Sequence, residues 1–160
     1  MEKNMQIREA KNEDIEQIVV ILEQISKMHY EKRPDIFKKK SKNEIRKNAI
    51  EIMNDKKRKV IVATDETLKI YGLIIYNIKE VKGHINIKDS KVLWIEELGV
   101  DEGYRKNGIG KMLMKKVEDD AKMLNCNRIE LNCWNFNDNA ISFYEGFGMK
   151  TQRRIMEKDI

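Results

Sequence analysis

Residues 94–124 carry the pattern that most constrains how this chain folds: a strand, a short basic loop with two glycines, and a helix. The strand, residues 92–100, is rich in Val, Leu, Ile and Trp and breaks at Asp101. Apolar residues then recur at helical spacing from Ile109 to Leu124, with charged residues on the other face. A strand that leads directly into an amphipathic helix favours an α/β fold.

The loop between this strand and this helix is suited to bind an anion. Arg105 and Lys106 supply two positive charges, and Gly108 and Gly110 lack a Cβ atom where the helix begins. The first N–H groups of a helix have no intrahelical partner, and the helix dipole is positive at that end. Residues 105–110 therefore predict a site for a phosphate or pyrophosphate group.

Two other phosphate-binding loops do not fit the same residues. Gly103 and Gly108 have the spacing of a nucleotide triphosphatase loop, but that loop continues with Lys and then Ser or Thr. This chain has Ile109 and Gly110 at those places. The dinucleotide fingerprint needs a further glycine where Leu113 stands, so both nucleotide-binding interpretations fail.

The remaining pattern resembles a known family. The strand, loop and helix, with Arg-x-x-Gly-x-Gly at residues 105–110, resemble the acetyl-coenzyme A binding motif of the GNAT N-acetyltransferases. Residues 137–148, Asn-x-x-Ala-x-x-x-Tyr-x-x-x-Gly, are similar to the second conserved segment of that family and lie at the expected distance. The resemblance implies an α/β fold with a mixed, mostly antiparallel sheet flanked by helices, in which the parallel fourth and fifth strands splay apart. It also implies acetyl-CoA as co-substrate.

The resemblance further implies which residues hold the coenzyme. In the family, the main chain at the end of the central strand pairs with the pantetheine arm and polarises the thioester carbonyl. Asn137 is expected to hydrogen-bond the coenzyme, and it is also a candidate cap for the helix that follows. The candidate cofactor-binding residues are Leu98, Gly99, Val100, Arg105, Lys106, Asn107, Gly108, Ile109, Gly110, Lys111, Asn137 and Ala140.

Transfer of an acetyl group to an amine needs a base for the amine proton and an acid for the departing thiolate. Glu96 and Glu97 are the candidate bases, and because adjacent strand residues point to opposite faces we expect at most one to face the acceptor. The resemblance ranks Glu96 first and leaves Glu97 as the substitute; the alternative for either is a surface carboxylate paired with a lysine. Tyr144, whose phenol keeps its proton at neutral pH, is the candidate acid, and its alternative is a core aromatic.

The two cysteines, Cys126 and Cys133, raise a competing mechanism through an acyl-cysteine intermediate. Both histidines, His29 and His84, lie far upstream in the sequence, so no adjacent base is available to activate a thiol. We therefore expect direct transfer in a ternary complex. The thiols are expected to be reduced and structural, and no metal site is predicted.

Composition bounds the remaining possibilities. The 160 residues contain no linker or repeat and predict a single domain over residues 1–160. No apolar run approaches the roughly 20 residues of a membrane helix, and the N-terminus lacks a signal peptide, so we expect a cytoplasmic protein. The net charge of +5 is spread over lysines with acids interspersed, which does not indicate nucleic-acid binding.

Three partners are consistent with this sequence: a small-molecule amine, a protein amine and, because dimers are frequent in the family, a second copy of the chain. The alternative to an enzyme is a non-catalytic sensor that binds acyl-CoA, in which Glu96 and Tyr144 would have no catalytic role. His29, Tyr30 and residues 33–37 are candidates for acceptor contacts, since the segment after the first helix lines that site in many GNAT proteins. The alternative there is a turn anchored in the core by Phe37.

Periodicity and turn residues predict the other elements. The predicted strands are residues 6–10, 60–64, 70–78 with a bulge at Gly72, 128–134, and closing strands within 149–158. One predicted helix is capped by Asn12 and ends before His29. Another is capped by Ser41 and ends near Met53, and a third is capped by Asn137 or Asp138.

Overall fold

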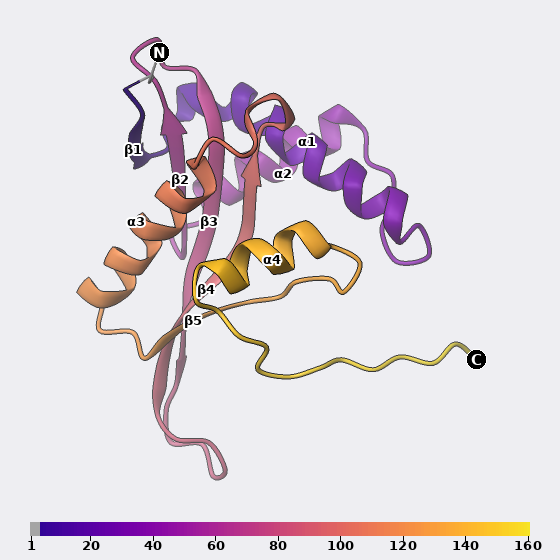
Figure 1. Ribbon diagram of the computed structural model, residues 1–160, viewed down its shortest axis with the longest axis vertical. Coiled ribbons are helices and arrows are strands. Elements are labelled where there is room, and N and C mark those ends of the chain that lie inside the picture. Colours follow the sequence, from indigo (N-terminus) through magenta and orange to yellow (C-terminus); the bar gives the residue numbers. More distant parts are fainter. Residues whose placement is uncertain (1–3) are drawn as a thin grey trace.

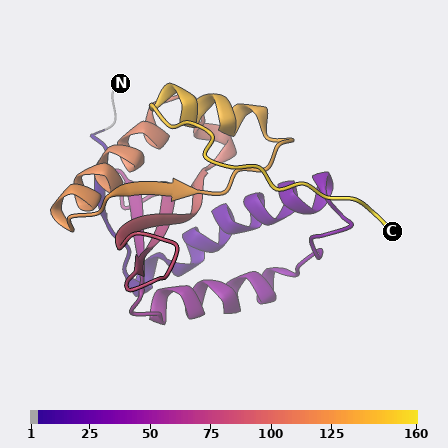
Figure 2. The same ribbon diagram turned by 90° about the horizontal axis from the view of Figure 1, so that it is seen from below.

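The structure, a computed structural model that describes residues 4–160, is a five-stranded sheet between two layers of helices (Figures 1 and 2). Strands β1 to β4 pair antiparallel in chain order, and β5 joins β4 in parallel. This mixed sheet confirms the predicted fold class. The elements are β1 (Gln6–Glu9), α1 (Ile15–Lys32), α2 (Lys42–Asn54), β2 (Arg58–Thr64), β3 (Ile70–Val81), β4 (Ser90–Val100), α3 (Ile109–Met123), β5 (Arg128–Leu131) and α4 (Asp138–Gly146).

Each face of the sheet has its own hydrophobic core because helices cover both faces. On one side, called the α1/α2 face, these two helices pack against alternate strand residues that include Val62 and Ile75. On the other side, called the α3 face, the helix packs against residues that include Ile74 and Leu93. A strand covered on both faces is expected to be apolar throughout, and residues 70–76 of β3 are all buried.

The prediction that the first helix ends before His29 is wrong, because α1 continues to Lys32. Pro34 disfavours the helical conformation only in the residue before it, Arg33, whose φ of −136° and ψ of 66° end the helix. His29 and Tyr30 therefore lie within α1. At 18 residues this is the longest helix, yet no helix within residues 4–160 is long and apolar enough to cross a membrane.

Two predicted strand segments do not form within the described chain. β5 ends at Leu131 instead of reaching residue 134, and residues 149–160 contain no strand where closing strands are predicted. Both predictions rest on local composition, whereas a strand persists only where a neighbour pairs with its backbone. The pairing of β5 with β4 ends at Ile95 and Leu131, so the continuation of β5 has no ladder to join.

The sheet contains two bulges, each with one extra residue. Tyr71 is the extra residue of β3 opposite β2, which confirms the bulge predicted at the neighbouring Gly72. Glu96 is the extra residue of β4 opposite β3, because Ile95 and Glu97 on either side of it pair with adjacent residues of β3. The second bulge therefore lies at the candidate catalytic residues.

Helix α1 lies directly against β4 at Gly99. A Cβ atom at this position would come within 2.7 Å of both Ile21 Cγ2 and Ile25 Cδ1. A larger residue would require Ile21 and Ile25 to move, so this glycine allows the close packing of α1 on the strand that carries Glu96 and Glu97.

We expect Gly99→Ala to lower the free energy of unfolding by about 1–3 kcal/mol, since the new methyl group overpacks the contact with α1. The matched control is Gly103→Ala, because no atom lies within 4 Å of a Cβ at Gly103. That change should stay within about 0.5 kcal/mol. Urea denaturation measures both, and equal midpoints for the two variants would contradict the close packing at Gly99.

Candidate active site

The bulge in β4 turns both candidate bases toward the α1/α2 face. Glu97 pairs with Ile75, whose side chain belongs to the core of that face. Glu96 bonds to Asn77, two residues further along β3, and so lies on the same face. The expectation that these adjacent acids point to opposite faces is therefore wrong, because the extra residue interrupts the alternation of the strand.

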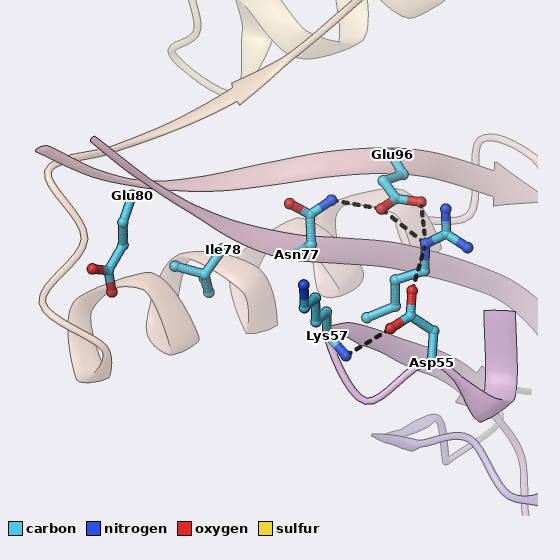
Figure 3. Close-up of a pocket in the computed structure, with 7 residues that line it drawn as sticks. Asp55, Lys57, Asn77, Ile78, Glu80 and Glu96 are labelled. Atoms are coloured by element: carbon cyan, nitrogen blue, oxygen red, sulfur yellow. Dashed lines mark hydrogen bonds and ion pairs between the residues drawn. The ribbon is translucent and has the colours of Figure 1, made fainter. Parts of the chain in front are cut away.

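Glu96 is held by polar neighbours at the edge of a cavity of about 550 Å³ (Figure 3). Arg58 Nε donates to Glu96 Oε1 over 3.1 Å, and the Asn77 amide donates to the same oxygen. Asp55 Oδ2 lies 3.7 Å from the same Arg58 nitrogen. The Glu96 carboxylate thus pairs with a cation and an amide. This corresponds to the alternative to a catalytic base, a carboxylate held in an ion pair. The cavity is lined by Asp55, Lys57, Arg58, Asn77, Ile78, Glu80 and Glu96.

Glu97 has a different environment from its neighbour. Its half-buried carboxylate makes no hydrogen bond or ion pair with any residue of the described chain. Burial raises the pKa of Glu97 to about 7, the charge of the nearby Glu96 adds to this rise, and Lys40 opposes it. A carboxylate with a pKa near neutrality is suited to accept a proton at physiological pH.

Tyr144, on α4, packs with the core of the α3 face. Its ring lies edge-on to Phe143, with ring centroids 5.3 Å apart. Burial raises the pKa of the Tyr144 phenol well above its usual range, and the nearby Cys133 and Glu97 raise it further. The phenol therefore keeps its proton at neutral pH. Tyr144 and Glu97 belong to opposite sides of the sheet and yet lie within electrostatic reach of each other.

Cys133 lies near Tyr144 but is not activated as a nucleophile. Partial removal of its sulfur from water raises the pKa of its thiol. Its one hydrogen bond within residues 4–160 is a weak donation to the Trp134 carbonyl oxygen at 3.9 Å. Burial also raises the pKa of Cys126. Both environments favour the neutral thiol over the reactive thiolate.

β4 and β5 separate beyond their last pair, Ile95 with Leu131 (Figure 1). β4 continues alone on this side as far as Val100, which gives the splayed parallel pair that the family resemblance implies. The backbone groups of residues 96–100 on the edge of β4 away from β3 have no strand of the described chain to pair with.

The loop that the sequence predicts to bind an anion, residues 105–110, directly precedes α3. Gly108 caps the helix with φ 78°, a left-handed conformation that favours glycine. No atom lies within 4 Å of a Cβ built there, and Arg105, Lys106 and Asn107 are exposed around it. The first-turn N–H groups of residues 109–111 have no intrahelical partner, and Lys111 adds a further exposed cation. These residues fit the pyrophosphate of coenzyme A.

Two predicted cofactor-binding residues also determine how α4 is attached. A Cβ at Gly110 would lie 3.0 Å from Phe143 Cζ, so this glycine lets α4 approach α3 closely. The Asn137 side-chain oxygen accepts a hydrogen bond from the Ala140 N–H at 3.2 Å, which confirms the predicted helix cap. The two contacts fix the position of Tyr144, which lies on the same helix.

An aromatic cluster that the sequence did not single out joins the end of α1 to the segment after β5. Ring centroids are 4.7 Å apart for His29 and Phe37, 5.3 Å for Phe37 and Trp134, and 5.8 Å for Trp134 and Phe136. Arg33 Cζ lies 5.4 Å from the centre of the Trp134 ring. Two aromatic residues within residues 134–136 could have indicated this cluster in the sequence, but only the fold brings them close to Phe37.

Lys40 links this cluster to the candidate base. Its charge lowers the pKa of Glu97 and also that of His29, which burial lowers more strongly. The structure thus brings His29 and Phe37 of the predicted acceptor segment toward the site. Tyr30 lies apart, in a separate cavity of about 240 Å³ that Lys39 and Lys40 also line.

Comparison with solved structures gives close matches to the whole fold. A mutant of the BH1408 protein from Bacillus halodurans is 28% identical, with a TM-score of 0.88 over 97% of this chain and 99% of that one. The aminoglycoside N-acetyltransferase AAC(6')-Iy, solved in complex with CoA, is 15% identical. It shares the fold with a TM-score of 0.77 over 100% of this chain and 97% of that one.

Curated relatives match over shorter stretches. YdhI of Bacillus subtilis (strain 168) is 35% identical over 86 residues, which are 54% of this chain and 46% of YdhI. The L-ornithine N5-acetyltransferase NATA1 of Arabidopsis thaliana is 40% identical over 55 residues, or 34% of this chain and 24% of that protein. The spermine/spermidine N(1)-acetyltransferase of Bacillus subtilis (strain 168) is 32% identical over 59 residues, which are 36% of this chain and 39% of that protein. The chain thus spans less than half the length of these relatives.

A sequence profile of the acetyltransferase (GNAT) family matches residues 22–149, which include α3 with its glycine loop, the splayed strands and α4. The profile covers most of the chain, and the solved structures share its fold. This chain belongs to the GNAT family of acetyltransferases.

Proposed function

We propose that the chain transfers the acetyl group of acetyl-CoA to a primary amine by direct attack within a ternary complex. The observation that carries this proposal is a pair of ionisable groups, Glu97 and Tyr144, that lie within electrostatic reach of each other. Glu97, with a pKa of about 7, is suited to accept a proton, and the protonated Tyr144 is suited to donate one. The amine nitrogen bonds to the acetyl carbonyl carbon as the carbon–sulfur bond breaks.

Glu97 is the proposed base in preference to Glu96. Two carboxylates side by side cannot both be ionised without cost, and the environment decides which of them takes up a proton near neutral pH. Glu96 is paired with Arg58 and Asn77, whereas the Glu97 carboxylate has no such partner in the described chain. Glu97 therefore removes the amine proton in this proposal, and Glu96 raises the basicity of Glu97 through its charge.

Tyr144 donates its proton toward the departing sulfur. Because its pKa lies above that of a typical thiol, about 8.5, a free tyrosinate is costly and must be reprotonated at once. Protonated Glu97, with a pKa of about 7, is a strong enough acid to do so. The net result is a relay of one proton from the amine through Glu97 and Tyr144 to the thiolate.

The donor is acetyl-CoA, whose thioester supplies the activated acetyl group. Arg105, Lys106 and the N–H groups after Gly108 would hold its pyrophosphate. The main chain from Leu98 to Val100, which pairs with β3 on one edge and lies beyond the pairing with β5 on the other, would pair with the pantetheine arm. Asn137 uses its oxygen as a cap and retains its amide N–H groups for the coenzyme.

The acceptor is proposed to be a small-molecule amine that lies against the aromatic cluster. The relatives named for ornithine, spermidine and aminoglycoside acetylation support testing those three classes first. Purified protein, acetyl-CoA and each amine should be incubated, and the products identified by mass spectrometry. Coenzyme binding without transfer to any amine, including lysine side chains of a protein, would favour the sensor function over the enzyme.

Gly108→Asp should weaken coenzyme A binding about tenfold or more, because a negative charge at the helix start opposes the pyrophosphate. Gly108→Asn is the matched control, since Asn has nearly the same shape and tolerates the same left-handed φ. Titration calorimetry compares the two. Equal affinities for Asp and Asn would contradict the assignment of this loop to the pyrophosphate.

Glu97→Gln should lower kcat/KM by about 10²- to 10⁴-fold with the best amine of the panel. In the wild type, protonation of Glu97 abolishes the base, so kcat/KM should rise as pH increases through about 7. In Glu97→Gln this rise of kcat/KM with pH should disappear. Glu96→Gln should keep the rise but move it to lower pH, because the substitution removes a like charge beside Glu97. If the rise is instead lost in Glu96→Gln and kept in Glu97→Gln, the base is Glu96.

Tyr144→Phe should lower kcat about 10²-fold while the coenzyme A dissociation constant and the urea midpoint stay unchanged. The substitution removes only the hydroxyl, and the Phe143 and Tyr144 rings would keep their packing. Single-turnover measurements with coenzyme-saturated protein give the rate per bound complex. If that rate is preserved while stability and coenzyme affinity fall together, Tyr144 is a core aromatic and not the acid.

A further inference from the structure

Residues 105–110, the loop proposed above to hold the pyrophosphate, have few contacts of their own. Residues 105–108 are all exposed, and Lys106 has φ 63°, a left-handed conformation that is unfavourable for a residue with a Cβ atom. The Arg105 and Asn107 side chains donate to backbone oxygens of residues that precede the loop, over 3.3 and 3.1 Å. A strained loop on the surface keeps its shape only where neighbouring elements hold it.

Tyr104 is the residue that ties this loop to the core. Residues 102, 103 and 105–108 on either side of it are exposed, whereas its ring packs with the core of the α3 face. The ring lies edge-on to Tyr71 of β3, with ring centroids 4.6 Å apart. The Tyr104 backbone oxygen accepts the hydrogen bond from Asn107, so the position of Tyr104 determines where the loop begins.

Lys69 holds the outer end of the Tyr104 side chain. Lys69 Nζ donates to the Tyr104 hydroxyl oxygen over 2.6 Å, and it lies 4.3 Å from the centre of that ring and 5.1 Å from the centre of the Tyr71 ring. A hydrogen bond from a charged donor is stronger than one between neutral groups, and contact with aromatic rings adds to it. The same bond raises the pKa of Lys69, which keeps the ammonium charged.

The turn between β2 and β3 that carries Lys69 is itself fixed by Asp65. One Asp65 oxygen accepts from the Thr67 N–H at 2.9 Å and from the Thr67 hydroxyl at 2.6 Å, and the Tyr71 hydroxyl donates to the other oxygen at 2.6 Å. These bonds lower the pKa of Asp65 to about 2, so it accepts as a carboxylate at neutral pH. Asp65, Tyr71, Tyr104 and Lys69 therefore form a closed ring of contacts between this turn and the loop.

Gln24 of α1 attaches the segment before Tyr104 independently of Lys69. The Gln24 amide donates to Asp101 Oδ1 over 3.3 Å, and the Gln24 side-chain oxygen accepts from the Glu102 N–H over 3.0 Å. Loss of the bond between Lys69 and Tyr104 should therefore loosen the loop without unfolding the chain.

We propose that Lys69 and Tyr104 are positioning residues for the coenzyme, and that the hydrogen bond between them holds residues 105–110 in the conformation that takes the pyrophosphate. The proposal rests on the function proposed above, since it concerns the same coenzyme site. A loop that is ordered in advance loses less conformational entropy on binding. The pair therefore acts on coenzyme affinity and not on the chemical step.

Titration calorimetry with coenzyme A tests the pair. Lys69→Met removes the donor and keeps a long apolar stem, and Tyr104→Phe removes the acceptor and keeps the ring. Each should weaken binding about three- to tenfold, the typical net contribution of one hydrogen bond. Lys69→Met should have no further effect in the Tyr104→Phe background, because the bond is already lost there. Lys69→Arg should keep most of the affinity. Lys59→Met, which removes an exposed lysine bonded to Glu9, is the matched control and should leave the affinity unchanged.

Kinetics and hydrogen exchange separate positioning from a general loss of structure. With an active amine, the KM for acetyl-CoA should rise in both single variants while kcat stays unchanged. The KM for S-acetylpantetheine, which lacks the pyrophosphate, should not change in either variant. In the free protein, the backbone amides of residues 105–112 should exchange faster in both variants than in the wild type.

Unchanged affinity together with unchanged exchange in both single variants overturns this inference alone. Equal effects of Lys69→Met in the wild type and in Tyr104→Phe overturn it as well, because Lys69 would then act only through its charge. A wild type that binds no coenzyme A contradicts the proposed function itself, on which this inference rests.

Discussion

The extra residue at Glu96 is the constraint on which the geometry of this site depends. A bulge bends its strand and increases the local twist. The pairing of β4 with β5 ends at Ile95, immediately before this residue, and the two strands then diverge. Glu97 lies on the α1/α2 face and Tyr144 packs with the core of the α3 face, yet the charge of Glu97 still raises the pKa of Tyr144.

The same bulge gives two adjacent glutamates different chemistry. Both face α1 and α2, but Glu96 meets Arg58 and Asn77 while Glu97 is partly removed from water without a partner in the described chain. The charge of the first then adds to the effect of burial on the second and brings its pKa to about 7. A pair of carboxylates in unequal environments is a common means of setting the pKa of one of them near neutrality.

Close backbone approach positions the elements around β4 and α3. Gly99 lets α1 pack on β4, and Gly110 lets α4 pack on α3 through Phe143. Gly108 has a separate role, since its left-handed conformation turns the chain into α3 with no side-chain cap on the first N–H groups. Of the two glycines of the loop motif, Gly110 serves helix packing and Gly108 the start of α3, and the motif alone does not separate these roles from the proposed binding of the coenzyme.

The sequence by itself determined the features that depend on near neighbours in the chain: the strand, loop and helix of the anion site, the Asn137 cap and the mixed α/β fold. These follow from periodicity and local hydrogen bonds. The tertiary structure decided which glutamate pairs with Arg58, how Trp134 meets Phe37, and that residues 149–160 form no strand within the described chain. Register, burial and strand pairing arise between segments far apart in sequence, so no local pattern encodes them.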